Sequence, residues 1–461
     1  MYNVILITID SLRADHLSCL GHHRNITPNI DNLARKGVIF TQAFANGPYT
    51  SYSFPSILTS NYGLMYPLKT PFKGVAVLSA PVLIGGVTLA EVLKRNGYST
   101  AAFHSNPLLS SYYAYNRGFD VFKELWSIGS DTLEKVKNHV IRRFYSKVLK
   151  LKSVKFLTSI MAKIPVIRKS DTSIINTHAL NWLQQNISKP FFLWLHYMGP
   201  HFPYTPSVTN LLTYITAECL NYKLRYENDL LYKDEVKQLI NLYDEKIKNL
   251  DYELKIFIEN LENIGISRDN TYFILTSDHG EEFGEHGGFL HGSPAGIAKL
   301  YDELLHVPLI ICGPNIPSNT VVRELVSLID LAPTILDLLN LPIPKEFLGN
   351  SLVPLIKAQR LEREVGVISE YYTPLQQGYS YRTHDWKYIL TFRGREIVEE
   401  LYRLKIDPKE RSNVVHEYKE LAETFKRKII NHIHFEKRFR LIRKKIMMTG
   451  KLRRAQRRLR V

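Results

Sequence analysis

Four runs of apolar and β-prone residues without a charge stand out along the chain, at residues 4–9, 99–103, 191–195 and 272–276. Runs of this kind are typical of strands that are buried on both faces, as they are in a parallel sheet. We therefore expect an α/β fold built on a large, mostly parallel sheet.

Helical patterns lie between these runs. The segment 27–37 begins with Thr-Pro, an N-cap followed by proline at the first helical position, and it ends in Gly. The segment 88–97 begins with the capping-box pattern Thr-x-x-Glu and also ends in Gly. Apolar residues at helical spacing predict a long amphipathic helix over about 234–263. These helices are expected to flank the sheet.

Side chains that can bind a metal or take part in catalysis follow two of the predicted strands directly. Asp10 comes after the strand at 4–9, and Asp278 and His279 come after the strand at 272–276. Ligands in open α/β sheets sit beyond the carboxyl ends of the strands. Two carboxylates and an imidazole that meet there can hold one divalent cation. The alternative interpretation of 278–291 is an acidic turn exposed to solvent.

Composition favours one enzyme-sized unit. The chain has 461 residues, of which 45% are hydrophobic, so it can bury a large core. No apolar run is long enough to span a membrane, and no secretory signal pattern precedes the first strand. Cys19, Cys219 and Cys312 are far apart and form no motif, which indicates a reducing compartment. We expect a cytoplasmic protein.

The net charge of +16 is concentrated in two segments. Residues 135–169 carry eleven Lys and Arg, residues 437–460 carry twelve, and neither segment contains an acidic residue. The segment 131–169 also shows apolar residues at helical spacing. It predicts a basic helix that lies on an anionic lipid surface or covers the active-site cleft, or else a packed helix with a solvated basic face.

The basic tail, residues 436–461, mixes apolar side chains with its cations. A helix of this composition predicts peripheral contact with an anionic membrane, at its inner face. A disordered, solvated tail is the alternative. Basic runs alone are nonspecific, so no specific nucleic-acid partner is predicted.

Several motifs resemble those of one family. They are Asp-Ser-Leu-Arg-Ala-Asp-His at 10–16, Thr-Pro-Asn-Ile-Asp-Asn-Leu-Ala at 27–34, Ser-Asp-His-Gly-Glu at 277–281, and the segment 300–311. In this order they resemble the motifs of the sulfatases, which belong to the alkaline phosphatase superfamily. The resemblance spans nearly the whole chain.

The resemblance implies the alkaline phosphatase-like fold and a domain organisation. It implies a catalytic domain at 1–350 with the basic insertion at about 131–169. It also implies a subdomain at 351–435 with a small antiparallel sheet, where residues 366–407 alternate aromatic and polar side chains, and a helix near 415–430. Residues 325–336 match the closing helix of the family.

The resemblance also indicates the nucleophile. Sulfatases carry a Cys or Ser that is oxidised to formylglycine, followed by x-Pro-Ser-Arg and then Leu-Leu-Thr-Gly. Aligning Ile57-Leu58-Thr59 with that last motif places Thr50 at the nucleophile position. Aligning the Pro-Ser pair instead places Ser53 there. Thr50 is preferred, and because threonine cannot become formylglycine, the usual hydrate mechanism is in doubt. Thr nucleophiles are found in the phosphodiesterases and phospho-group transferases of the superfamily.

Five further residues are named as candidates from the resemblance. His201, in Pro-His-x-Pro-Tyr, and His291 are expected to stabilise the ester oxygens or to protonate the leaving alcohol. Asn106 is expected to bind substrate, with His104 as the alternative, and His196 is a weaker candidate for the same role.

The implied metal site consists of Asp10, Asp278 and His279 around one divalent ion. Because Ser11 replaces the second Asp of sulfatases and His279 replaces their Asn, Mn²⁺ or Zn²⁺ is favoured over Ca²⁺. We therefore predict a metal-dependent hydrolase of anionic sulfate or phosphate esters with Thr50 as metal-activated nucleophile. One alternative is a phosphodiesterase or phospho-group transferase acting on a lipid- or polymer-linked substrate. The other is an inactive member that binds polyanions or membranes.

Overall fold

The computed structural model describes residues 1–69, 80–126, 163, 165–167, 170–186, 188–206, 208–227, 231–291, 298–359 and 366–458. Nearly all of the basic segment 131–169 lies outside the described residues, so the helix expected there stays a prediction. The part that is described includes β7 (Pro165–Ile167), a short strand paired with β9 (Val208–Asn210).

A nine-stranded mixed sheet forms the centre of the molecule, in the order β14-β2-β13-β10-β1-β8-β5-β6, with β15 also paired to β2. All of these strands run in one direction except β13, which is antiparallel to both of its neighbours. The expected large, mostly parallel sheet is thus confirmed. The strand bounds are β1 Asn3–Ile9, β2 Val38–Phe44, β5 Ser99–His104, β6 Val121–Glu124, β8 Phe191–Tyr197, β10 Thr271–Ser277, β13 His306–Cys312, β14 Thr320–Val322 and β15 Val326–Ser327.

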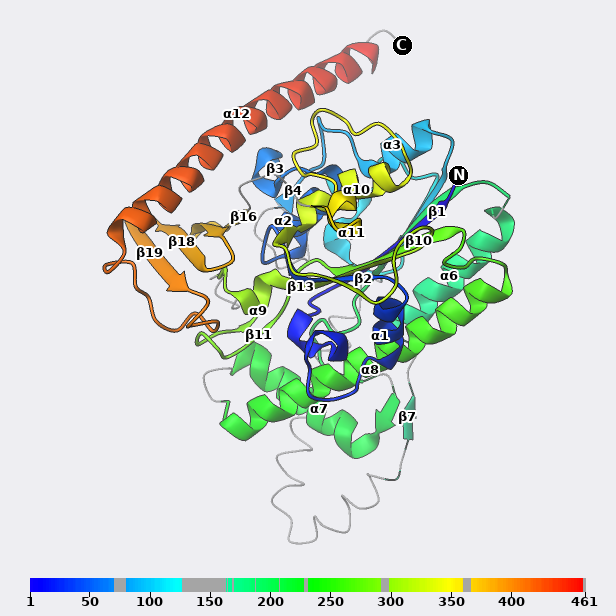
Figure 1. Ribbon diagram of the computed structural model, residues 1–461, viewed down its shortest axis with the longest axis horizontal. Coiled ribbons are helices and arrows are strands. Elements are labelled where there is room, and N and C mark those ends of the chain that lie inside the picture. Colours follow the sequence, from blue (N-terminus) through cyan, green and yellow to red (C-terminus); the bar gives the residue numbers. More distant parts are fainter. Residues whose placement is uncertain are drawn as a thin grey trace.

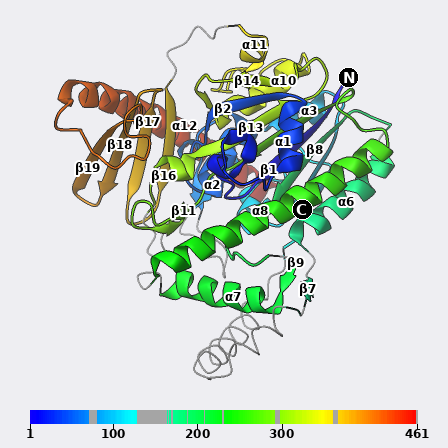
Figure 2. The same cartoon turned by 60° about the horizontal axis from the view of Figure 1, so that its bottom comes forward.

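Side-chain alternation along the strands builds one apolar core on each face of the sheet. In β1, Val4 and Leu6 join the core beneath α2, α3, α10 and α11, whereas Ile5, Ile7 and Ile9 join the core beneath α1, α6, α7 and α8. Figures 1 and 2 show these two helical layers on opposite sides of the sheet. The helix bounds are α1 Pro28–Arg35, α2 Thr50–Thr59, α3 Leu89–Arg95, α6 Asp171–Asn186, α7 Leu211–Tyr226, α8 Lys233–Asn263, α10 Leu331–Leu338 and α11 Val353–Ile356. Helices α1, α3 and α8 confirm the sequence predictions.

The register of the central strands brings their carboxyl ends to one edge. Ile9 of β1 pairs with Ser277 of β10, so Asp10 and Asp278 leave the sheet side by side. Thr8 of β1 pairs with His196 of β8. The site predicted from the strand ends therefore has the arrangement that parallel pairing requires.

One predicted helix begins later than expected. Within 325–336, Val326 and Ser327 form β15 and pair with Ala43 and Phe44 of β2. A 3₁₀ turn follows, and α10 begins only at Leu331. The prediction that the whole segment is helical was wrong because strand pairing takes its first residues.

A four-stranded antiparallel sheet follows near the C-terminus, as expected, with β16 Val367–Tyr372, β17 Gln377–Arg382, β18 Trp386–Arg393 and β19 Glu396–Arg403. Its first strand is attached to the segment before α2. The amide of Glu370 donates to the carbonyl of Asn46 at 2.9 Å, and Ser369 Oγ donates to the carbonyl of Ala45 at 2.6 Å. The small sheet thereby supports the backbone that leads to Thr50.

The last helix, α12 (Lys419–Arg458), runs without a break through the residues expected to form a separate tail. Figure 1 shows it starting beside β18 and β19 and extending along one side of the molecule. Glu436 and Arg443 are buried against the body, whereas Leu441 and Met448 are 61% and 55% exposed. Within the described part of the chain, no helix has the length and apolarity that a membrane span requires.

Candidate active site

Two carboxylates with no solvent exposure lie at the centre of the candidate site. Asp278 Oδ1 accepts hydrogen bonds from the amides of Ser11 and His279, at 3.3 and 3.0 Å. Asp10 accepts from Ser11 Oγ at 3.0 Å and from Asn106 Nδ2 at 2.8 Å. Among the described residues, no hydrogen bond reaches Asp278 Oδ2. Burial, and then the charge of Asp10, raise the pKa of Asp278, so two anions there need a compensating cation.

The ring of His279 turns its unprotonated nitrogen toward both carboxylates. Its Nδ1 lies 2.8 Å from the carbonyl of Gly280, which only accepts, so Nδ1 carries the proton. Its Nε2 then presents a lone pair 3.7 Å from Asp10 Oδ1 and 3.6 Å from Asp278 Oδ2. Burial, and then His291, lower the pKa of His279 to about 4, which keeps the ring neutral.

His196 repeats this arrangement from the neighbouring strand. The hydroxyl of Thr8 donates to the carbonyl of Leu195 at 3.2 Å, so its oxygen accepts from His196 Nδ1 at 3.0 Å. The bare Nε2 of His196 lies 3.3 Å from Asp10 Oδ2, and it has no hydrogen bond to any residue that the structure describes.

These observations fit a divalent metal. Asp10, His196 and Asp278 bring three ligand atoms within 4.8 Å of one another, and His279 Nε2 lies 3.6–3.7 Å from the two carboxylates. Nε2 of His196 and Oδ2 of Asp278 have no hydrogen-bond partner among the described residues, and such unpaired buried acceptors are costly without a cation. A donor set of two carboxylates and two imidazoles suits Mn²⁺ or Zn²⁺ better than Ca²⁺, which prefers oxygen.

Thr50 lies at the first position of α2 and points into this group. Its Oγ1 is 3.4 Å from Asp10 Oδ2 and 3.4 Å from His279 Nε2. The helix N-terminus adds partial positive charge at the same place. The close turn before it requires Gly47, where a Cβ would lie 2.6 Å from Cβ of Tyr52. Thr50, the residue preferred from the sequence, therefore lies beside Asp10 and His279.

Ser53, the alternative nucleophile, lies three positions after Thr50 along α2. It is fully buried, and its Oγ has no hydrogen-bond partner in the described ranges. No contact of Ser53 with the two carboxylates is observed among the described residues. The geometry therefore favours Thr50 over Ser53 as the residue nearest to the metal ligands.

Two imidazoles lie on the open side of the group, their ring centroids 5.1 Å apart. His201 Nδ1 donates to the carbonyl of Phe202 at 2.5 Å, and its Nε2 lies 4.0 Å from Asp10 Oδ1. Burial lowers the pKa of His201. His291 Nδ1 instead lies 2.9 Å from Glu281 Oε1. Burial opposes protonation of His291, but Glu281 overcomes it and raises the pKa of His291. Burial and neighbouring charge thus move the pKa values of the two imidazoles in opposite directions.

Asn106 and His104 differ in position. Asn106 reaches the group, since its Nδ2 lies 2.8 Å from Asp10 Oδ2 and 3.5 Å from Thr50 Oγ1. Its Oδ1 is occupied by the amide of Leu108. His104 is fully buried against Trp194, and burial lowers its pKa to about 3. Asn106 is therefore the better placed of the two.

Sequence reasoning assigned no role to Thr8, Glu281 and Tyr204. Thr8 fixes the tautomer of His196, and its signal was a polar residue inside an apolar strand. Glu281 orients His291 and accepts a hydrogen bond from Tyr204 Oη at 2.7 Å. No pattern in the sequence pairs Tyr204 with a carboxylate 77 positions away.

Known proteins resemble this chain along most of its length. The sequence profile of the sulfatase family matches residues 2–341, and that of the N-sulphoglucosamine sulphohydrolase C-terminal region matches residues 284–435. Arylsulfatase K of Bos taurus is 25% identical, over 94% of this chain and 82% of its own. A sulfatase of Formosa agariphila is 26% identical, over 90% of this chain and 83% of its own.

Solved structures share the fold. One, in complex with its substrate D-glucosamine-2-N,6-O-disulfate, has a TM-score of 0.69 and 21% identity and covers 95% of this chain and 98% of its own. The phosphonate monoester hydrolase of Agrobacterium radiobacter has a TM-score of 0.69 and 20% identity and covers 95% of this chain and 96% of its own.

Proposed function

The chain belongs to the sulfatase family, and from that membership and its site we propose a metal-dependent hydrolase of anionic esters that uses the Thr50 hydroxyl as nucleophile. One observation carries the proposal. Oγ1 of Thr50 lies 3.4 Å from an oxygen of Asp10 and 3.4 Å from Nε2 of His279, in a pocket that is closed to bulk water. A hydroxyl in that position is inert unless a metal or a base activates it.

Asp10, Asp278 and His279 would hold the metal, and His196 presents a fourth donor. A divalent cation supplies Lewis acidity, which lowers the pKa of a neighbouring hydroxyl and polarises a non-bridging oxygen of the ester. Asn106, whose Nδ2 donates to Asp10 at 2.8 Å, orients that carboxylate. Each of these side chains lies within two residues of the end of a strand of the central sheet.

The protein's own groups can carry out both halves of a substitution. Thr50 Oγ1 attacks the sulfur or phosphorus atom as its proton passes to Asp10, whose Oδ2 lies 3.4 Å away, and the bond to the leaving alcohol breaks. The alcohol takes a proton from Nε2 of His291, which Glu281 keeps protonated. An ester on Thr50 results. Neutral His291 then removes a proton from the water that attacks this ester. The bond to Thr50 Oγ1 breaks and Oγ1 takes back its proton from Asp10, so the enzyme returns to its starting state.

The molecule that accepts the sulfo or phospho group from Thr50 distinguishes a hydrolase from a transferase. Water as acceptor gives a hydrolase, whereas an alcohol of a lipid or polymer gives a phospho-group transferase. Because threonine forms no formylglycine hydrate, the covalent ester on Thr50 is required in either case. Relatives act on a sugar disulfate or are phosphonate monoester hydrolases, so both sulfate and phosphate classes belong in a substrate screen.

Acid quenching during turnover tests the proposal. Aryl sulfate, aryl phosphate and phosphodiester substrates are each mixed with the enzyme loaded with Mn²⁺, Zn²⁺ or Ca²⁺. The peptide that contains 50–59 is then analysed by mass spectrometry. We expect a sulfo or phospho group on Thr50. The same group on Ser53 would overturn the assignment.

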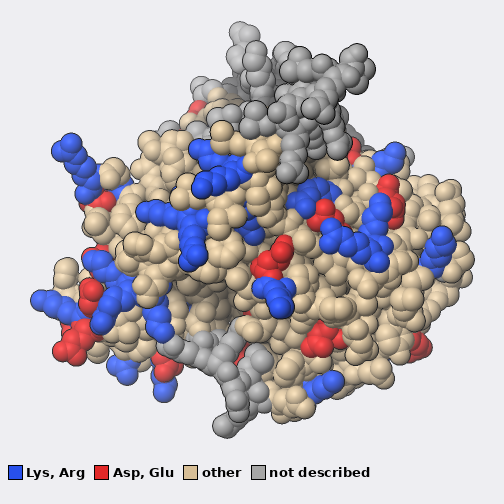
Figure 3. Space-filling view, turned by 90° about the horizontal axis from the view of Figure 1, so that it is seen from above, with Lys and Arg blue, Asp and Glu red and all other residues tan. Residues whose placement is uncertain are grey.

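The exposed side of α12 supports a second proposal, peripheral contact with an anionic membrane. Leu441, Ile442, Ile446 and Met448 are each about half exposed or more, and Lys444 and Lys445 lie exposed among them. Figure 3 shows many Lys and Arg side chains on the face seen from above, the side on which Figure 1 draws α12. Each basic residue near an anionic leaflet contributes about 1 kcal/mol. A lipid-linked or polymeric anionic ester would be met at such a surface.

A further inference from the structure

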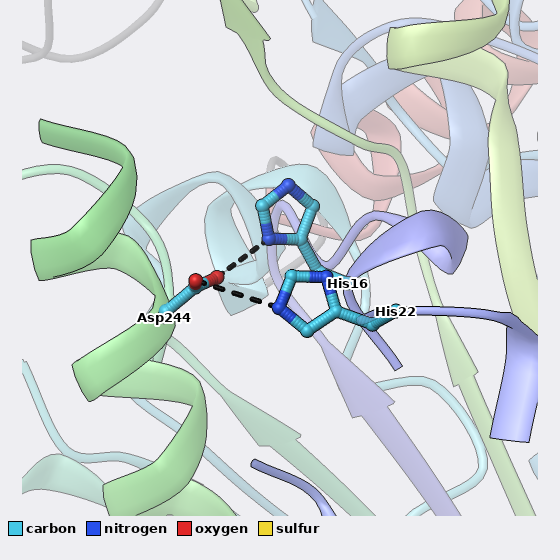
Figure 4. A group of neighbouring side chains, drawn as sticks. All are labelled: His16, His22 and Asp244. Carbon is cyan, nitrogen blue, oxygen red and sulfur yellow. Dashed lines mark hydrogen bonds and ion pairs between the residues drawn. The ribbon is translucent and has the colours of Figure 1, made fainter. Parts of the chain in front are cut away.

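A second group of metal-ligating side chains lies outside the candidate active site, between the loop after β1 and helix α8. Nδ1 of His16 is 2.6 Å from Oδ1 of Asp244, and Nε2 of His22 is 3.5 Å from Oδ2 of the same carboxylate. Figure 4 shows both rings directed at Asp244 from one side. The side chains of His16, His22 and Asp244 are 9%, 6% and 3% exposed, so all three are largely withdrawn from water.

The tautomer of His22 leaves a lone pair on the ring nitrogen that faces the carboxylate of Asp244. Nδ1 of His22 lies 3.2 Å from the backbone carbonyl of Asp15, which can only accept, so Nδ1 carries the proton. Nε2 then directs a bare lone pair at Asp244. This buried nitrogen has no hydrogen-bond partner anywhere in the described chain. A carbonyl that fixes the distal nitrogen of a ring is the arrangement that orients histidine ligands in metal sites.

Arg24 contacts the same carboxylate but makes no hydrogen bond to Nε2 of His22. Its Nη1 donates to Asp244 Oδ2 at 3.0 Å and its Nη2 donates to Asn241 Oδ1 at 2.6 Å, but its side chain is 41% exposed. The guanidinium therefore approaches from the solvent side and leaves Oδ1 of Asp244 to His16.

We propose that His16, His22 and Asp244 form a second divalent-metal site, of the zinc class, that is separate from the one at Asp10 and Asp278. The three ligand atoms lie within 4.8 Å of one another. Two imidazole nitrogens and one carboxylate oxygen are the donors that Zn²⁺ takes at tetrahedral sites, and they disfavour Ca²⁺ and Mg²⁺. The fourth position is left to water.

An ion in this position would hold the loop after β1 against α8, next to the catalytic strand end. Tyr243, the neighbour of Asp244, donates through Oη to the carbonyl of Ser11 at 2.7 Å and accepts from the amide of Arg13 at 2.9 Å. Ser11 has a φ of 60°, a left-handed conformation that a serine adopts at a cost. The second site would therefore help to keep the residue after Asp10 in this conformation. It is a positioning site and touches no substrate.

Zinc stoichiometry tests the proposal on the full chain. Metal-free protein is loaded with Zn²⁺, dialysed against a weak competing chelator, and analysed by elemental mass spectrometry. We expect two equivalents in the wild type and one in His22→Ala. His22→Gln, which keeps a side chain of similar length, is measured beside it so that a folding defect is recognised. His23→Ala is the matched control and keeps two equivalents.

The two sites are distinguished by Asp278→Asn, which weakens the active-site ion and leaves the zinc that depends on His22. As a second measurement, zinc raises the midpoint of thermal unfolding of Asp278→Asn, and His22→Ala added to that variant removes the rise. Equal zinc content in the wild type and both His22 variants would overturn the proposal. Equal losses in His22→Ala and His23→Ala would also overturn it, because they would show nonspecific binding by the loop.

Discussion

Nε2 of His196 lies 3.3 Å from Oδ2 of Asp10 with both side chains fully buried. Thr8 Oγ1 donates to the carbonyl of Leu195 and lies 3.0 Å from the opposite ring nitrogen, so we assign the proton to that nitrogen and a lone pair to the one that faces Asp10. Two acceptors that face each other away from water require a cation between them or beside them. His196, expected from sequence only as a weaker contact for substrate, thereby becomes a fourth donor to the metal that we propose.

Replacing His196 by phenylalanine tests its role as a donor. His196→Phe keeps the ring volume between Phe54 and Trp194 and removes the lone pair. We expect the affinity for Mn²⁺ or Zn²⁺ to fall on the order of 10- to 100-fold, the loss typical when a group that supports a metal site is removed. Competition with a chromogenic chelator measures it. His104→Phe, a buried neighbour with no contact to Asp10 in the described chain, should leave the affinity unchanged.

The pairing of Glu281 with His291 predicts the direction of a pH shift. Glu281 raises the pKa of His291, although burial alone would lower it, so His291 stays protonated to higher pH. Activity that needs this proton is present below the raised pKa and is lost as pH rises through it. Glu281→Gln should therefore move the alkaline limb of kcat/KM to lower pH.

The control for this shift is Glu282→Gln, since Glu282 pairs with Lys299 at 2.8 Å and has no contact with His291 in the described residues. An alkaline limb that stays in place in Glu281→Gln, or moves equally in Glu282→Gln, would contradict the role of His291 as the acid.

Much of this arrangement could be predicted from sequence because it depends on local patterns. Uncharged β-prone runs identified the central strands, and parallel pairing then made Asp10 and Asp278 neighbours. The direction of β13 could not be predicted, since an apolar strand pattern is compatible with parallel and with antiparallel pairing. The roles of Thr8 and Tyr204 depend on register and on distant packing, which no spacing in the chain encodes. The continuity of α12 was missed because its buried Glu436 and Arg443 look like surface residues in a basic tail.

A buried charge cluster should dominate the stability of the C-terminal subdomain. Nζ of Lys387 has no solvent exposure and lies 2.8 Å from Asp302 and 2.7 Å from Glu410. Lys387→Met leaves two carboxylates without this partner, so we expect the free energy of unfolding to fall by about 3 to 5 kcal/mol in urea titrations. Lys426→Met breaks a half-buried pair with Glu399 and should cost about 1 kcal/mol or less.

The same cluster predicts acid sensitivity. Burial would raise the pKa of Asp302, but Arg382 and Lys387 lower it well below its usual value. Its contribution to stability is therefore present above the unfolded pKa of about 4 and is lost as pH falls toward the folded pKa. A wild-type stability that does not decrease below about pH 4 would contradict this account.

Membrane contact through α12 predicts salt-sensitive binding to anionic vesicles. Lys444→Glu combined with Lys445→Glu changes only exposed residues, whereas truncation before Arg443 would also remove its buried hydrogen bond to Asn61. The double variant should pellet less with anionic liposomes than the wild type, and high salt should release the wild type. Equal pelleting of both proteins, or pelleting that resists salt, would contradict an electrostatic contact.

The most direct test of the catalytic account is the turnover of Thr50→Ala with the best ester found in the screen. Thr50 is 4% exposed and its Oγ1 lies 3.4 Å from both Asp10 Oδ2 and His279 Nε2, so alanine removes the proposed nucleophile with little change in packing. We predict a loss of kcat on the order of 1000-fold or more with unchanged metal content, and partial activity in Thr50→Ser. Turnover of Thr50→Ala at the wild-type rate would contradict the account.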